Sequence, residues 1–323
     1  MNNKYDHLEL GQFIPAQYHF NMLNDTARMQ GFAQALQQVV WPGAKVLELG
    51  GGTGVLSFFA ARRAGHVWCV ERNPELVAIS HRILRQNPNG HKVEIIQADA
   101  RFYVPPEPVD VVICEMLHVG LLREKQVEII DKFKQRYLEK FGGPLPIFVP
   151  EACIQAFQLV EQDFNFEGYY APTISFQDPT ATQDRTQNLS VPTLFQRFSY
   201  EDALPDVCSW DGDVAIAVGG RLNAIRVITK NILAIHMEEQ RSIDWYNQYL
   251  IVPLDEPLDV RVRDSVAVQF DYRPGAPLDA LSDSLRVSVV SDGPSRPDFA
   301  KNAPILMLFL NKTQCVGIIT ACM

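Results

Sequence analysis

Hydrophobic residues in the first 150 positions form short continuous runs, which are separated by stretches with helical spacing. The runs predict buried strands and the spaced stretches predict helices. The predicted strands cover 44–50, 66–71, 92–97 and 109–115, and the predicted helices cover 54–64, 73–84 and 122–141. This alternation is typical of an α/β fold, in which a parallel sheet carries helices on both faces. We therefore expect residues 1–150 to form one such domain, which includes an N-terminal helix.

After residue 150 the pattern changes to short strand-like runs. These runs cover 152–160, 213–218, 248–254, 259–272 and 284–291. In the last run Leu285, Val287 and Val289 alternate with polar residues, as in an antiparallel strand with one exposed face. We expect an all-β domain over residues 151–323. Residues 171–205 are rich in Pro, Thr, Gln and Asp and are too long for an ordinary connection, so they predict an insertion, arm or lid.

Composition fits a globular protein of about two domains, with 323 residues, 47% hydrophobic and 21% charged. The net charge of −9 argues against a surface that neutralises phosphates, and therefore against a nucleic-acid partner. The same charge favours a cationic partner or substrate, although many cytosolic enzymes carry a similar imbalance.

Six cysteines are scattered along the chain without a CxxC pair, which argues against a zinc site and a disulfide framework. They are Cys69, Cys114, Cys153, Cys208, Cys315 and Cys322. The N-terminus has no apolar leader core, and runs such as residues 305–310 are far shorter than the roughly 18 residues of a membrane helix. We expect a cytoplasmic protein with no membrane partner and no metal.

A glycine cluster follows the first predicted strand, in an ExGxGxG pattern. Its members are Glu48, Gly50, Gly52 and Gly54. Glycines at a strand-to-helix turn let a ligand approach the backbone closely, because no Cβ stands in the way. The dinucleotide fingerprint requires its third glycine where this chain has Val55, so a dinucleotide pyrophosphate is poorly supported.

Two acidic residues extend this glycine turn into a candidate adenosine site. Glu71 ends the second strand and can accept hydrogen bonds from both ribose hydroxyls. Asp99 follows the third strand, where it can meet the adenine. The alternative is a plain tight turn with Glu71 as a solvated strand end. With Glu48 and the glycines, the pattern resembles class I S-adenosylmethionine-dependent methyltransferases, which implies a Rossmann-like domain and S-adenosyl-L-methionine as the cofactor.

A pair of glutamates forms a second candidate site, after the adenosine site. Glu115 ends the fourth strand, at the edge where α/β sheets bind ligands, and Glu124 follows nine residues later. Two carboxylates in one cleft repel each other unless a cation lies between them, and a planar guanidinium with five donors suits that place. Alternatively, Glu124 only complements a helix dipole and Glu115 is a surface residue.

The glutamate loop resembles the double-glutamate loop of the protein arginine methyltransferase family, SExxxxxxLLxES. Cys114, Glu115, Leu121, Leu122 and Glu124 occupy matching places. Upstream, HFNMLNDTARM resembles the family motif HEEMLKDxxR; the matches are His19, Met22, Leu23, Asp25 and Arg28. In the family this arginine binds the cofactor's carboxylate, a role the resemblance gives to Arg28, with His19 and Met22 beside it.

The resemblance continues into the second half, from about residue 18 to residue 290. FVPEACIQAFQLVE resembles the family's junction into its β domain, and the stretch from Asp244 to Val266 resembles a later pair of strands. The family fold implies a barrel-like substrate domain, and its dimerisation arm lies where this chain has residues 171–205. We therefore expect a homodimer, while the composition of that segment is equally consistent with a flexible loop.

Three departures concern the substrate more than the cofactor. The family's threonine-histidine-tryptophan loop is here Ile243, Asp244 and Trp245, so its histidine is absent. The residues after Glu115 also differ, and of the aromatic helix motif before His19 only Phe13 is a plausible remnant. The differing residues are Met116, Leu117, His118 and Val119.

His118 is a candidate replacement for the missing histidine, although a lone loop histidine is usually solvated or structural. Asp244 and Trp245 are candidate substrate-binding residues, although a tryptophan that opens a strand is often part of the core.

We therefore expect an N-methyltransferase that uses Glu115, Glu124 and His118 to methylate a guanidino nitrogen of a protein substrate. Two rival interpretations stay open. In the first, the acceptor is an Asn or Gln side-chain amide of a protein, or a small metabolite. Otherwise the chain is a non-catalytic scaffold that binds the cofactor.

Overall fold

The computed structural model describes residue 14, residues 16–236 and residues 238–290. Five parallel strands form one sheet in the order β3-β2-β1-β4-β5. They are β1 (Lys45–Leu49), β2 (His66–Glu71), β3 (Val93–Gln97), β4 (Val111–Cys114) and β5 (Ile147–Val149). The strand order reverses direction between β1 and β4. Ligands of open α/β sheets bind outside the carboxyl ends of the strands at such a switch point.

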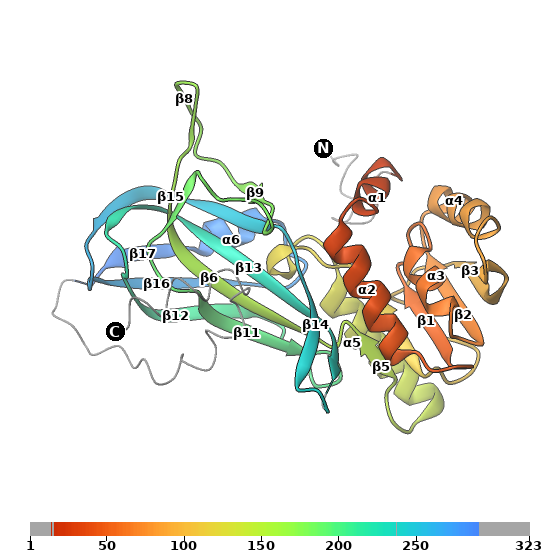
Figure 1. Cartoon of the computed structure of the whole chain (residues 1–323). Coiled ribbons are helices and arrows are strands. Elements are labelled where there is room, and N and C mark those ends of the chain that lie inside the picture. Colours follow the sequence, from red (N-terminus) through yellow and green to blue (C-terminus); the bar gives the residue numbers. More distant parts are fainter. Residues whose placement is uncertain (1–13, 15, 237, 291–323) are drawn as a thin grey trace, which may run out of the picture.

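Helices pack around this sheet (Figure 1). They are α1 (Ala16–Met22), α2 (Thr26–Val39), α3 (Val55–Ala61), α4 (Pro74–Leu84) and α5 (Gln126–Phe141), with single turns η1 (Gly90–Lys92) and η2 (Val119–Leu121). The side chain of Asn73 caps α4 by accepting from the Glu75 amide at 2.9 Å.

Antiparallel strands follow, beside the parallel sheet (Figure 1). The larger sheet has the order β10-β6-β13-β15-β9, with β11 on β6 and β14 on β13. Its strands are β6 (Ala152–Gln162), β9 (Ser175–Gln177), β10 (Thr186–Asn188), β11 (Thr193–Ser199), β13 (Gly220–His236), β14 (Arg241–Tyr246) and β15 (Tyr249–Val260). A second sheet pairs β12 (Cys208–Ala215), β16 (Ser265–Tyr272) and β17 (Arg286–Val289), the last preceded by α6 (Asp279–Ser284).

The predicted fold class is therefore confirmed: a Rossmann-like parallel sheet with helices precedes a domain of antiparallel strands. The change of sheet type falls between Val149 and Ala152. The division into domains at residue 150 and the closure of the antiparallel strands into a barrel stay predictions.

The longest strand, β13, was not predicted. Its sequence places polar residues among the apolar ones, and the structure buries Asn223, Arg226, Lys230 and Asn231 inside the sheet. A hydrophobic pattern cannot show strands whose polar side chains are buried against one another. Conversely, the run predicted over 259–272 is two strands, because the chain turns at Arg263, where φ is 77°.

Residues 171–205 differ from the expected insertion, arm or lid. Three strands within this range, β9, β10 and β11, pair into the larger sheet. The part that projects from the molecule comes just before it, as the hairpin of β7 (Asn165–Phe166) and β8 (Tyr169–Tyr170), visible in Figure 1.

Four cysteines in the described ranges, Cys69, Cys114, Cys153 and Cys208, are buried and form no disulfide. Cys315, Cys322, the apolar run 305–310 and Phe13 lie outside the described residues. Within the described ranges, each helix is too short or too polar to cross a bilayer.

Helix α2 lies between the two sheets and contacts α3 on one side and β13 and β14 on the other. Gly31 permits this approach, because a Cβ there would lie 3.0 Å from Cδ1 of Leu233. The N-terminal half of α2, which carries Arg28, is thereby fixed against the antiparallel strands.

The loop between β4 and α5 is held by the antiparallel sheets. The Gly120 amide donates to Oγ1 of Thr229 at 2.7 Å, and Oη of Tyr272 donates to the Gly120 carbonyl at 2.8 Å. The Leu121 carbonyl accepts from the Gly275 amide at 2.7 Å. Gly120 has a φ of 70°, a left-handed conformation that glycine adopts without strain.

Replacing Tyr272 tests this attachment. Tyr272→Phe should lower the free energy of unfolding by about 1–3 kcal/mol, because the buried Gly120 carbonyl loses its donor. Denaturant unfolding measures the change, and Tyr169→Phe is the matched control, since Tyr169 is 73% exposed on the hairpin. Equal stability of the two variants would show that the hydrogen bond does not hold the loop.

Candidate active site

A cavity of about 490 Å³ lies at the carboxyl ends of β1, β2 and β4. The glycine turn, Glu71 and Asp99 line one part of it, and the glutamate loop lines another. Helices α1 and α2 contribute further walls, and the antiparallel domain contributes Phe176, Trp245 and Asn247. The cavity therefore joins the two parts of the chain.

The glycine turn leaves no room for side chains. The amides of Gly50 and Gly51 both donate to the Val70 carbonyl at 2.9 Å. A Cβ on Gly51 would lie 2.2 Å from Sγ of Cys69, and one on Gly52 would lie 3.0 Å from Nδ1 of His19. The backbone of this turn consequently forms the cavity wall itself.

Glu71 is a fixed wall residue and only 9% exposed, so it is no solvated strand end. Its Oε2 accepts from the Gly52 amide at 2.8 Å and its Oε1 from the Asn73 amide at 2.7 Å. Each carboxylate oxygen has a second lone pair, so both can still accept from a ligand.

Asp99 lines the same part of the cavity. Partial burial would raise its pKa, but hydrogen bonds and positive charge from Arg101 and Arg72 outweigh burial and lower the pKa of Asp99. Arg101 Nη2 lies 2.7 Å and Arg72 Nη1 3.3 Å from Oδ2 of Asp99. The carboxylate is therefore charged and oriented.

Glu48 lies beneath the glycine turn and also lines the cavity. Its carboxylate accepts from the Ser57 amide at 2.8 Å and from the Ser57 hydroxyl. Burial raises the pKa of Glu48 to about 8. Gly54 differs from the other predicted residues, because it is not among the described residues that line the cavity; it starts α3 with a φ of 79° and faces Leu84.

Glu115 and Glu124 line one cavity, as the sequence predicted. Burial, and then the negative charge of Glu115, raise the pKa of Glu124 to about 8. The two carboxylates therefore lie close enough to repel each other.

Gln126, which the sequence analysis missed, clamps the loop around Glu115. Its Nε2 donates to the Cys114 carbonyl at 2.6 Å, and its Oε1 accepts from the Met116 amide at 2.9 Å. One buried carboxamide thus fixes the backbone on both sides of Glu115. Helix α5 begins at Gln126 itself, so Glu124 lies before the helix and not in its first turn.

Arg28 is 5% exposed in the first turn of α2 and forms an ion pair with Glu115. Its Nε is buried and has no hydrogen-bond partner among the described residues. Asp25 fixes this helix start, since its Oδ1 accepts from the Arg28 amide at 2.8 Å. Arg28 therefore lies at the cavity wall with donor capacity to spare.

His19 and Met22 line the cavity from α1, as predicted. Burial, and then the positive charge of Arg28, lower the pKa of His19 to about 4. The imidazole is thus neutral near pH 7 and adds no positive charge beside Arg28.

His118 lines the cavity as well, and its ring meets that of Phe176 edge-on at 5.5 Å. Burial lowers the pKa of His118 to about 4, with a smaller contribution from the charge of Arg123. A histidine with so low a pKa is a weak base at neutral pH. The geometry favours a packing role over the predicted catalytic one.

Asp244 and Trp245 are placed differently from each other. Trp245 lines the cavity, and its Nε1 donates to Oδ2 of Asp25 at 3.2 Å. Asp244 is not among the described lining residues and pairs with Nζ of Lys230 at 2.7 Å. Asp244 therefore lies apart from the described cavity lining, because neighbouring residues on a strand point to opposite faces, and its substrate-binding role stays a prediction.

The sequence analysis also missed Tyr18, Phe176 and Asn247 in the cavity wall. Asn247 donates through Nδ2 to the Leu117 carbonyl at 3.2 Å, which attaches the glutamate loop to the antiparallel domain. Across the described ranges, no three His, Cys, Asp or Glu side chains are placed to hold a metal ion.

The raised pKa values of Glu48 and Glu124 predict a pH-dependent stability. Both pKa values are about 8, well above the roughly 4.3 of an unfolded glutamate. Between these values the folded chain keeps protons that the unfolded chain has lost, so the free energy of unfolding should fall as pH rises from about 5 to 8. Glu124→Gln should make this decline shallower, by up to about 1.4 kcal/mol per pH unit.

Denaturant unfolding at several pH values measures this slope. Glu139→Gln, an exposed glutamate on α5, should leave the slope unchanged. The interpretation of Glu124 as a protonated group fails if its variant and the control have the same slope.

Comparisons with known proteins agree with this geometry. The profile of a methyltransferase domain family matches residues 46–139. An arginine N(omega)-methyltransferase of Streptomyces achromogenes is 31% identical over 284 residues, covering 79% of this chain and 76% of that protein. An uncharacterized protein of Methanocaldococcus jannaschii is 26% identical over 270 residues, covering 83% of this chain and 96% of that protein.

The fold is also similar to that of the Trypanosoma brucei PRMT1 enzyme-prozyme complex, which was solved with AdoHcy. The TM-score is 0.67 at 15% identity, over 87% of this chain and 95% of that chain. The chain belongs to the protein arginine methyltransferase family of class I S-adenosylmethionine-dependent methyltransferases, as a divergent member.

Proposed function

We propose that this methyltransferase transfers the methyl group of S-adenosylmethionine to a guanidino nitrogen of an arginine side chain in a protein. The observation that carries the proposal is the pair Glu115 and Glu124, which line one cavity beside the glycine turn. Two carboxylates that repel each other form a site for a cation, and the family resemblance makes the cation a guanidinium.

The residues around the glycine turn fit the cofactor. The turn carries no side chain at Gly52, where a Cβ would lie 3.0 Å from Nδ1 of the cavity-lining His19, so a ligand would lie directly against the backbone. Glu71 would accept from the ribose hydroxyls, Asp99 would meet the adenine, and Arg28 would hold the carboxylate through its spare donors. When bound, the cofactor would supply a methyl group on a sulfonium, whose sulfur leaves as a neutral thioether, and the methylated nitrogen would lose one proton.

The chain's own contribution is orientation and electrostatic complementarity. Glu115 and Glu124 would accept hydrogen bonds from the guanidinium and hold one terminal nitrogen toward the methyl group, at near-attack distance. Drawing the positive charge toward the far nitrogens leaves lone-pair density on the near one. A cation beside Glu124 also favours the ionised form of that carboxyl, so acceptor binding and proton release from Glu124 are coupled.

A carboxamide acceptor is the second candidate. With a pKa of about 8, Glu124 is largely protonated at pH 7 and can donate a hydrogen bond to an amide carbonyl. An Asn or Gln side chain, or a small metabolite with an amide, would use such a donor. Amino-acid analysis of the methylated product distinguishes this acceptor from arginine.

Replacing one glutamate tests the proposed role. Glu124→Gln should lower methyl transfer by at least about 100-fold, because the cation loses half of its charged site, while the Kd for S-adenosylmethionine changes by only a few fold. Transfer of labelled methyl to protein, followed by amino-acid analysis, measures the first quantity, and calorimetry measures the second.

Glu139→Gln is the control for this experiment and should keep wild-type transfer. An equal loss of cofactor affinity in Glu124→Gln would remove the assigned role. A wild-type chain that binds the cofactor but transfers no methyl group to any acceptor would leave the scaffold interpretation.

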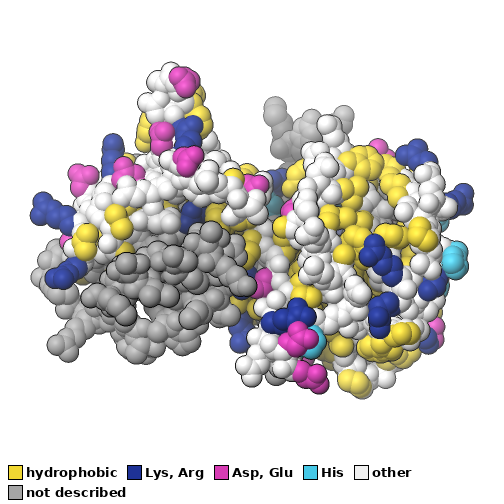
Figure 2. Space-filling view, in the orientation of Figure 1, with side chains coloured by type: hydrophobic (Ala, Val, Ile, Leu, Met, Phe, Trp, Pro, Cys, Tyr) yellow, Lys and Arg dark blue, Asp and Glu magenta, His cyan; other side chains and the backbone are white. Residues whose placement is uncertain are grey.

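We also propose a homodimer, in which the β7–β8 hairpin of one copy contacts the parallel-sheet domain of the other. The hairpin exposes Phe166, Tyr169 and Tyr170. Figure 2 shows hydrophobic side chains gathered over the parallel-sheet domain. Phe58 and Phe59 on α3, in the same domain, are partly exposed. Apolar groups at both places have the chemistry of a protein interface.

Light scattering tests the dimer. The double change Tyr169→Ser and Tyr170→Ser should convert the dimer to a monomer, because the hairpin loses most of its apolar surface. Val262→Ser, an equally exposed apolar residue outside the hairpin, should leave the mass unchanged. A monomeric wild-type chain would contradict the proposal.

A further inference from the structure

We propose that Phe176 and His118 form a specificity wall, an apolar surface that binds the methylene stem of the acceptor side chain. This inference rests on the proposed function, because it concerns the acceptor that the two glutamates hold. It gives part of segment 171–205 a role within the active site of its own chain.

The two wall residues belong to the acceptor part of the cavity. His118 lies three residues after Glu115 on the same loop, whereas the glycine turn, Glu71 and Asp99 lie at the ends of β1, β2 and β3. Phe176 meets His118 edge-on at 5.5 Å and an interplanar angle of 86°. The ring pair therefore belongs to β9 and to the loop that carries Glu115, whereas the residues proposed to hold the adenosine lie at other strand ends.

Both sides of the wall are held in place. On one side, Phe176 is the central residue of β9 and pairs with Leu250 of β15. The next residue, Gln177, donates through Nε2 to Oγ1 of Thr186 at 2.6 Å and to Oε1 of Gln162 at 3.0 Å. A short edge strand with such bonds presents its ring in a fixed position.

On the other side, Asn247 donates to the Leu117 carbonyl at 3.2 Å, and its Oδ1 accepts from Nδ2 of Asn231 at 2.8 Å. This buried chain of amides fixes the backbone just before His118. The wall is thus preorganised, which reduces the entropy lost when an acceptor binds.

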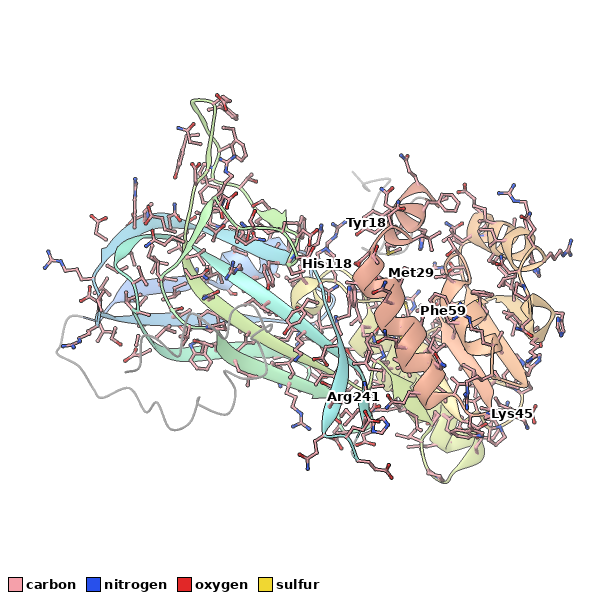
Figure 3. The ribbon with its side chains drawn as sticks, in the orientation of Figure 1. Tyr18, Met29, Lys45, Phe59, His118 and Arg241 are labelled. Atoms are coloured by element: carbon pink, nitrogen blue, oxygen red, sulfur yellow. The ribbon has the colours of Figure 1, made fainter. Side chains whose placement is uncertain are left out.

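The wall is uncharged and still accessible. Phe176 is 41% exposed, although its backbone is paired within the sheet. His118 is neutral near pH 7, so it does not repel a cation held by Glu115 and Glu124. Figure 3 shows His118 and Tyr18 at the space between the two domains, and Tyr18 lines the same cavity.

Acidic groups beside an apolar wall match an amphipathic acceptor, with a cationic head on a chain of methylene groups. Arginine has this form, since its stem packs on apolar surfaces while its head stays charged. An Asn side chain has a single methylene group and no charge, so it would leave the wall uncovered. The wall therefore favours a long cationic side chain over a short amide.

Removing the ring of Phe176 distinguishes the contribution of the wall to acceptor binding from that of the two glutamates. With a short peptide that contains one arginine, Phe176→Ala should raise KM about tenfold, because about two methylene groups lose their apolar contact. The kcat should stay within about twofold, since the guanidinium is still held. With methylguanidine, which has no stem, Phe176→Ala should leave kcat/KM unchanged.

Phe176→Leu and Val191→Ala are the comparison variants. Phe176→Leu keeps an apolar side chain and should recover most of the affinity for the peptide. Val191→Ala removes a side chain of similar exposure from the same segment, outside the described cavity lining, and should behave as wild type. Denaturant unfolding checks that each variant is folded, and calorimetry gives the Kd of the peptide without turnover.

The outcomes distinguish the inference from the proposed function. A wild-type chain that methylates the peptide, with KM and Kd unchanged in Phe176→Ala, overturns the wall and keeps the function. An equal loss with methylguanidine also overturns the wall, because the ring would then act on the whole site. A wild-type chain that methylates neither guanidino acceptor overturns both.

Discussion

The repulsion between Glu115 and Glu124 is the constraint on which the rest of the site depends. Burial, and then the negative charge of Glu115, raise the pKa of Glu124 to about 8, and two carboxyl groups in such a cavity cannot both ionise freely. Folding the chain around such a pair costs free energy unless the loop that carries them is fixed from outside. The antiparallel strands supply that support, through Thr229 and Tyr272. The second domain is therefore part of the active site, because it determines where the two acids lie.

Arg28 lines the same cavity as this acidic pair and the glycine turn. Its guanidinium pairs with Glu115, and helix α2 places it between the two sheets. In the proposed function the same side chain would bind the cofactor carboxylate beside the acceptor site. Its charge partly offsets the acidic pair, while its unsatisfied Nε keeps a donor for a ligand. One arginine therefore pairs with Glu115 and, among the described residues, still has a donor free at the cavity wall.

The parts of the site that sequence could predict are those set by local geometry. A strand, a glycine turn and a helix follow each other directly, so the spacing of Gly50, Gly52 and Glu71 indicates their arrangement. The contacts of Asp244, Gln126 and Phe176 depend instead on which strands pair and in which register. Asp244 pairs with Lys230 on β13. The sequence did not predict this strand, because polar residues that are buried lie among its apolar ones. A shift of one residue moves a side chain to the other face of a sheet, and no local pattern shows that choice.

The strand that lacks the family histidine still contacts the start of α2, through a group that does not titrate. Oδ2 of Asp25 accepts from the Trp245 indole, whose N–H has no acid-base chemistry near neutral pH. The indole can fix Asp25, and through it the start of α2, but it cannot move a proton. Burial lowers the pKa of His118 to about 4, so its imidazole is neutral near pH 7, and its catalytic role stays a prediction. A site without a histidine that titrates near neutral pH suits methyl transfer from a sulfonium, where orientation and the placement of negative charge contribute more than proton abstraction before attack. In the proposed function, the two glutamates and the wall of Phe176 and His118 would then select the acceptor.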